Sequence, residues 1–76
     1  MTEDAIKATR ALAAVQRALA ISQLPYPRRS WLEAFHRKLV GIRDEGIVLT
    51  PENRARLERL TRIVEDMVDQ HRKSLN

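Results

Sequence analysis

The stretch Asp44–Asn53, "DEGIVLTPEN", decides the fold, because it carries the signals that end one helix and begin another. Gly46 is the residue type that most readily adopts the left-handed conformation found after the last turn of a helix. Thr50 can cap the next helix with its hydroxyl group, and Pro51 fits the first helical position, where its missing N–H is not needed. The stretch therefore predicts two helices joined by a short turn.

Three large aliphatic residues, Ile47, Val48 and Leu49, occupy this turn, where polar residues are usual. The residue that follows a glycine stop often contacts the last helical turn, so we expect Ile47 to fold back on the preceding helix. We expect Leu49 to enter the core and Val48 to point outward. The alternative interpretation of these residues is an exposed apolar contact for a partner.

Outward from this turn, the sequence predicts an all-α chain. We expect three helices, at about residues 3–24, 30–45 and 51–73. The first is rich in Ala, the best helix former. We expect the second and third to form a helical hairpin and the third, at the C-terminus, to be the longest.

The boundaries of the first two helices follow from local signals. Thr2 can cap the first helix. Pro25 and Pro27 interrupt the helical pattern, because each biases the residue before it away from helical angles. Ser30 and Glu33 have the spacing of a capping box, which predicts that the second helix begins at Ser30.

The chain has 76 residues and is expected to form a single domain, residues 1–76. A chain this short has a marginal core and usually needs an additional source of stability. It contains no Cys, which excludes disulfides and thiolate metal sites, and its two His residues lack the spacing of metal ligands. We therefore expect no cofactor and no metal, and we expect dimerisation to complete a helical bundle.

The third helix carries an apolar row with the 3-4 spacing of a coiled-coil seam. The row consists of Leu57, Leu60, Val64, Met67 and His71. It predicts the contact surface of a homodimer, and the same row could instead pack within the monomer.

Composition narrows the class of function. The net charge is +4, and acids are interleaved with the basic residues almost everywhere, which is typical of a solvated surface. No apolar run has the length of a membrane span, and the N-terminal residues lack the features of a signal peptide, so we expect a cytoplasmic protein. No group of residues has the arrangement of a catalytic site, so we expect that the protein is not an enzyme.

These observations favour a small regulator or inhibitor that acts by stoichiometric contact with another protein. The expected contact residues lie near the helix connections and beside the seam: Tyr26, Arg28, Arg29, Val48, Ile63 and Val68. Apolar or aromatic anchors with Arg at the margin are typical of such interfaces.

The alternative is a small DNA-binding transcriptional regulator of the helix-turn-helix type, in which the arginines that follow the turn would contact DNA. These are Arg54, Arg56, Arg59 and Arg62, with Arg28 and Arg29 before the second helix. The arginines of the third helix diverge around its axis and have acids among them, which makes nucleic acid the less favoured partner. A structural subunit of a larger assembly is a third class.

The segment from Trp31 to Leu60 contains the pattern W-x3-F-x3-L-x2-I, then G-x2-LT, then L-x2-L. In this pattern the chain resembles small all-helical accessory proteins of phages and other mobile elements. This type of protein includes inhibitors that bind one host protein, such as anti-CRISPR proteins and antagonists of transcription regulators. The resemblance implies a host-directed inhibitor and assigns no role to any single residue.

Overall fold

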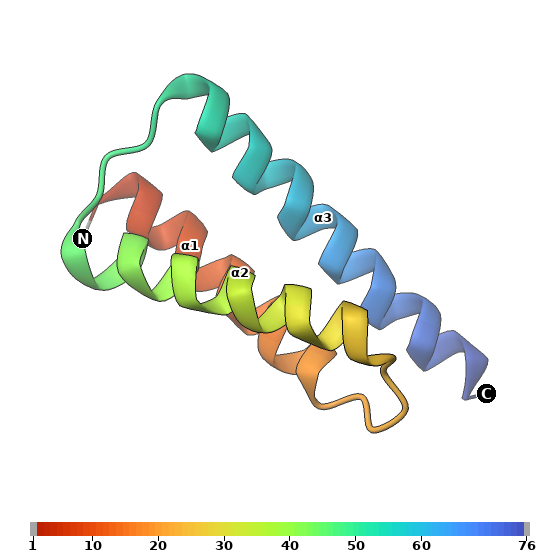
Figure 1. Cartoon of the computed structure of the whole chain (residues 1–76). Helices are drawn as coiled ribbons and strands as arrows, with labels where there is room; N and C mark the ends of the chain where they lie inside the picture. The colour runs from red at the N-terminus through yellow and green to blue at the C-terminus, as the bar shows by residue number, and fades with distance from the viewer. Residues whose placement is uncertain (1, 76) are drawn as a thin grey trace.

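The computed structural model describes residues 2–75 and consists of three α-helices joined by two short loops (Figure 1). The helices are α1 (Glu3–Leu19), α2 (Tyr26–Glu45) and α3 (Pro51–Ser74). They run alternately up, down and up, and the molecule measures 39 × 20 × 19 Å. The predicted all-α fold with three helices and a long C-terminal helix is confirmed.

Three of the predicted helix signals are found. The Thr2 hydroxyl accepts a hydrogen bond from the Ala5 N–H at 3.1 Å, and the Thr50 hydroxyl accepts one from the Asn53 N–H at 3.1 Å. Gly46 follows α2 with φ of 65°, in the left-handed region. A residue with a Cβ atom would be strained at this position, so glycine sets the end of α2.

The predicted start of α2 is wrong. The helix begins at Tyr26, with Pro25 as the N-cap residue and Pro27 in the first turn. Proline is tolerated there because the N–H groups of the first turn have no partner within the helix. Ser30 therefore lies inside α2, and the capping box that it would form with Glu33 does not exist.

The first helix also ends earlier than predicted, at Leu19, with Ala20 as its C-cap residue. The guanidinium group of Arg29 donates hydrogen bonds to the carbonyl oxygens of Leu19, at 3.2 Å, and Ile21, at 2.9 Å. Carbonyl groups at a helix end lack partners within the helix. Arg29 therefore joins the start of α2 to the end of α1.

The core is centred on α1, which packs against both α2 and α3. Five of its six alanines are almost fully buried: Ala5, Ala8, Ala11, Ala14 and Ala18. Leu12 and Val15 of α1 are also buried. The other two helices contribute the buried residues Leu32, Phe35 and Leu39 from α2 and Leu57, Thr61 and Val64 from α3. The small α1 side chains let other helices approach closely, as expected for packing within the monomer.

The predicted hairpin of helices 2 and 3 is not found as a packed pair. No Cα atom of α2 lies within 8 Å of a Cα atom of α3, although a short loop joins the two helices. The reason is that both helices direct their most buried residues toward α1. The third helix therefore leaves a space between itself and α2, which Figure 1 shows widening toward the loop at residues 46–50.

The aliphatic residues of this loop lie largely as predicted. Leu49 is partly buried and packs against the core, whereas Val48 is 78% exposed. Ile47 lies beside Gly41 of α2: a Cβ atom added at Gly41 would be 4.0 Å from the Cδ1 atom of Ile47. Ile47 therefore folds back on the helix, although 42% of its surface stays exposed.

A buried carboxylate, Asp4, ties this loop to α1 and α3. Asp4 is only 4% exposed and accepts hydrogen bonds from Arg54 Nε at 2.8 Å and from the Leu49 N–H at 2.9 Å. Arg54 also donates to the Leu49 carbonyl oxygen at 3.2 Å. The hydrogen bonds from Arg54, and then that from Leu49, lower the pKa of Asp4 to about 2. The sequence analysis missed this pairing.

We predict that the pH dependence of stability depends on Asp4. Its ordinary pKa is 3.8 and its folded pKa is about 2, so the unfolded chain takes up the proton first as pH falls. The stabilisation is fully present above pH 4, and it is lost as pH falls from about 4 to about 2. Chemical denaturation of Asp4→Asn should show lower stability at pH 7 and a weaker pH dependence in this window.

Asp44→Asn is the matched control for this prediction. Asp44 is exposed and, within residues 2–75, forms an ion pair with the adjacent Arg43 alone, and surface pairs of this kind contribute little. This variant should stay close to wild type at pH 7. Equal losses in the two variants would contradict the structural role of Asp4.

The loop supplies a second prediction. Leu49→Ala should lower the free energy of unfolding by about 2 kcal/mol, because a partly buried aliphatic side chain is lost. Val48→Ala should lower it by less than about 0.5 kcal/mol, because Val48 is mostly in solvent. Urea denaturation measures both, and equal small losses would show that Leu49 contributes nothing to the core.

Candidate functional site: an apolar groove between α2 and α3

The space between α2 and α3 forms a groove made of two adjoining hollows, with volumes of about 780 and about 520 Å³. Trp31 lines both hollows and so joins them into one surface. The larger lies toward the start of α2, where Pro25 and Pro27 contribute to its wall. The smaller lies toward the loop that contains Leu49.

On each wall of the groove, five of the lining residues follow one another at a 3-4 spacing. On α2 these residues are Arg28, Trp31, Phe35, Lys38 and Ile42. On α3 they are Arg56, Leu60, Ile63, Met67 and Gln70. Helices that pack lengthwise in coiled coils and four-helix bundles present rows with this spacing.

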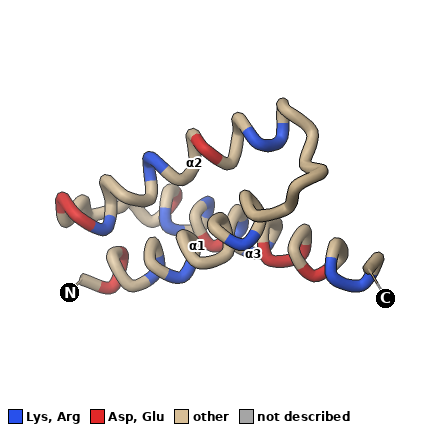
Figure 2. The backbone as a smooth tube through the Cα atoms, turned by 90° about the horizontal axis from the view of Figure 1, so that it is seen from below, with Lys and Arg blue, Asp and Glu red and all other residues tan. Residues whose placement is uncertain are grey.

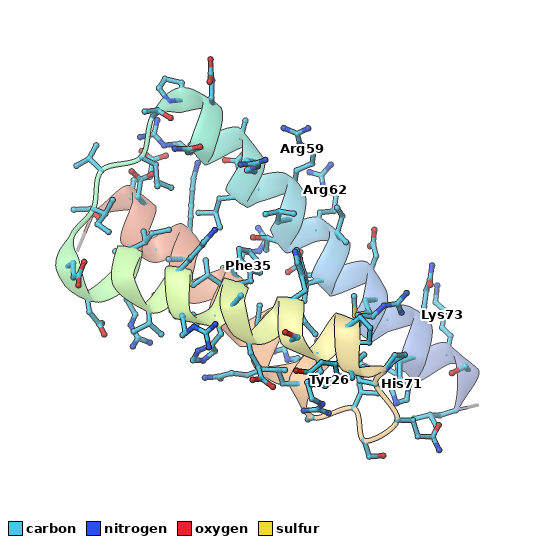
Figure 3. All side chains as sticks on the ribbon, in the orientation of Figure 1. Tyr26, Phe35, Arg59, Arg62, His71 and Lys73 are labelled. Carbon is cyan, nitrogen blue, oxygen red and sulfur yellow. The ribbon has the colours of Figure 1, made fainter. Side chains whose placement is uncertain are left out.

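Trp31 and Ile63 are the most exposed apolar residues of the groove, with 40% and 50% of their surfaces accessible. The ring of Trp31 packs against that of Phe35, with the ring centroids 5.4 Å apart. Figure 3 shows Phe35 directed into the space between α2 and α3. The indole of Trp31 therefore lies at the groove side of the core and remains partly in solvent.

The structure divides the predicted self-association row between two surfaces. Leu57 and Val64 are 4% and 0% exposed and belong to the core around α1. Leu60 and Met67 line the groove and are partly buried. His71, the last member, is partly buried near the C-terminal end of α3 (Figure 3). The row is therefore divided between the core and the groove, and its role in self-association stays a prediction.

The predicted partner-binding residues also separate. Arg28 and Ile63 both line the larger hollow. Tyr26 and Val48 are both highly exposed. Tyr26 is the first residue of α2 and Val48 follows its last residue, so the two lie at opposite ends of the helix and do not form one surface. Val68 packs against the core.

Arg29 is the sixth of these residues, and its guanidinium group is already bonded to carbonyl oxygens at the end of α1. Arg29 therefore has a role in the fold, and its predicted role at a partner interface stays a prediction. Leu60 and Met67, which the sequence places in the self-association row, also line the groove.

Lysines and arginines are interleaved with acids along the helices (Figure 2), and several are paired between α1 and α3. Lys7 binds Glu58, and Arg10 binds Glu65 at 3.2 Å. The groove differs, because neither Lys38 nor Arg56 forms an ion pair with any residue in the range 2–75.

No protein-family model, curated protein or solved structure shows significant similarity to this chain. Within residues 2–75, no helix combines the length and hydrophobicity needed to cross a bilayer. The same residues hold no cluster of three or more His, Asp or Glu side chains suited to a metal ion. The groove between α2 and α3 is the candidate functional site.

The position of Trp31 supplies a third prediction, with its neighbour Leu32 as the matched control. Trp31→Ala should lower the free energy of unfolding by about 1 kcal/mol, because the indole is partly solvated. Leu32→Ala should cost about 3 kcal/mol, because Leu32 is fully buried. Chemical denaturation followed by circular dichroism measures both. A larger loss for Trp31 would place it in the core and not in the groove.

Proposed function

We propose that this protein is a small regulator or inhibitor that binds another protein stoichiometrically, by accepting an amphipathic helix in the groove between α2 and α3. The observation that carries this proposal is the pair of walls with 3-4 spacing on either side of an apolar hollow. Recognition of a helix by an apolar groove is a recurring mode of peptide binding.

The shape of the fold favours a helix as the occupant. Three helices with α1 in the middle leave α2 and α3 apart, so the arrangement lacks the fourth helix that would close a bundle. A helix placed in the groove would pack on α2 and α3 at the same time, at the interaxial distances of about 8–10 Å usual for such contacts. Trp31 and Ile63 would then be covered.

A helix from another protein fits better than a second copy of this chain. Outside the groove, the exposed large apolar residues among residues 2–75 are scattered over helix ends and loops: Ile6, Tyr26, Ile47, Val48 and Leu75. They form no helical row that a second copy could insert, and two concave grooves placed face to face would not fill each other. We therefore propose a helix of another protein as the occupant, with which a homodimer formed through Leu60 and Met67 would compete.

DNA binding has less support. Arg54, one of the arginines expected to contact DNA, is held by the buried Asp4. Figure 3 shows Arg59 and Arg62 pointing away from the body of the molecule, on the side of α3 opposite α2. These two residues would give salt-sensitive binding without sequence preference.

The resemblance to phage accessory proteins adds the kind of target to this proposal, which is a protein of the host. A chain that occupies one helix of a host protein would block whatever that helix normally contacts. Such inhibition needs no catalytic residues, and its extent would be set by stoichiometry and affinity.

A fourth prediction tests the proposed function with two exposed isoleucines. Ile63 lines the groove and is 50% exposed, whereas Ile6 lies on α1 and is 56% exposed. A displayed library of amphipathic helical peptides should yield binders that retain affinity for Ile6→Glu and lose at least about tenfold for Ile63→Glu, because a buried charge at the interface is costly. Titration of Trp31 fluorescence should saturate at one peptide per chain.

Three outcomes would contradict this function. One is equal binding to the two variants, which would place the interface elsewhere. Another is sedimentation equilibrium showing a dimer that the peptides do not dissociate, which would favour a second copy as the occupant. The third is sub-micromolar, sequence-selective binding to duplex DNA in 150 mM salt, which would favour the helix-turn-helix alternative.

A further inference from the structure

The charge of the groove is unequal along its length. In the larger hollow, the positive charge of Arg28 is balanced by Asp66. In the smaller hollow, Lys38 projects from the α2 wall and Arg56 from the α3 wall, and neither Asp nor Glu is among the lining residues. The half of the groove near the loop at residues 46–50 therefore has two cations, one on each side.

The surroundings of these cations determine what they can bind. The other residues of the smaller hollow are mostly apolar: Trp31, Ala34, Phe35, Leu39, Ile42, Leu49, Leu57 and Leu60, with Asn53. An occupant must therefore place apolar side chains between the two helices and charged groups only at its edges. In packed helices, the positions that flank the apolar row hold the charges that select the partner.

We propose that the helix bound by this groove has an apolar row flanked on both sides by acidic residues over the half that passes between Lys38 and Arg56. This inference rests on the proposed function and adds the chemistry of the partner. One carboxylate row would face Lys38 and the other Arg56. The half that reaches Arg28 and Asp66 would carry no such requirement.

The same charges separate this occupant from the other candidates. A second copy of the chain placed groove to groove would bring its own Lys38 and Arg56 into a region that already has two cations and no acid, which is unfavourable. A nucleic acid would satisfy the cations but would leave the apolar lining uncovered, because phosphates are bound mainly through cations and polar groups.

The test uses three synthetic three-heptad peptides with the same leucine row and with Glu, Gln or Lys at the flanking positions. Binding is measured by the fluorescence of Trp31, the single tryptophan of the chain. The Glu peptide should bind tightest and the Lys peptide weakest, with about a tenfold difference at low salt that shrinks as salt increases. The Gln peptide should lie between them.

Charge reversal identifies the cations responsible. The double variant Lys38→Glu with Arg56→Glu should invert the order of the Glu and Lys peptides. The matched control, Arg37→Glu with Arg59→Glu, changes the net charge equally and on the same two helices, at exposed residues outside the groove lining. It should preserve the original order.

The outcomes separate the two proposals. If all three peptides bind equally to the wild type and Ile63→Glu weakens them all, the groove function stands and the acidic preference is overturned. The preference is also overturned if the control variant inverts the order as strongly as the groove variant. If no peptide binds, or if Ile63→Glu has no effect, the groove itself is not the interface and both proposals fail.

Discussion

Close packing of alanines on α1 is the constraint on which the rest of the structure depends. Alanines at five positions of this helix are no more than 3% exposed, and their small side chains let α2 and α3 approach α1 along different sides. Each outer helix therefore uses only part of its apolar surface to cover α1. The unused part of α2, around Trp31, and of α3, around Ile63, forms the walls of the groove.

Polar contacts at both ends of the bundle help to hold the outer helices on α1, while no Cα atoms of α2 and α3 approach within 8 Å. At one end, the carboxylate of Asp4 fixes Arg54 and the backbone of Leu49. At the other end, Arg29 bonds to the carbonyl groups that follow α1. Asp4, Arg54 and Arg29 do not line the groove, and Leu49 takes part through its backbone N–H, so a bound helix would leave these contacts intact. The groove is therefore preformed, which lowers the ordering cost of binding.

Local signals predicted the fold well because they act within a few residues. The glycine stop at Gly46 and the cap at Thr50 depend only on neighbouring backbone groups, and both are present. The 3-4 row on α3 was harder to interpret, because two rows are interleaved on this helix. Leu57 and Val64 belong to the core around α1, and Leu57 also reaches the smaller hollow. Leu60 and Met67 line the groove, and spacing alone does not separate the two rows. The Asp4–Arg54 pair joins residues far apart in the chain, so no local pattern could reveal it.

A chain of this size has little stability to spare, yet it leaves a tryptophan and an isoleucine partly in water within one groove. Covering these side chains in the monomer would require α2 and α3 to meet, and α1 prevents this by occupying the space between their buried faces. A helix from a partner would supply the missing contact and, because it binds only the folded chain, would raise the free energy of unfolding. The same apolar surface would thus contribute to affinity and to stability. Selectivity would have to come from the polar residues at the groove margin. Lys38 and Arg56 lie there, and neither forms an ion pair with another residue in the range 2–75.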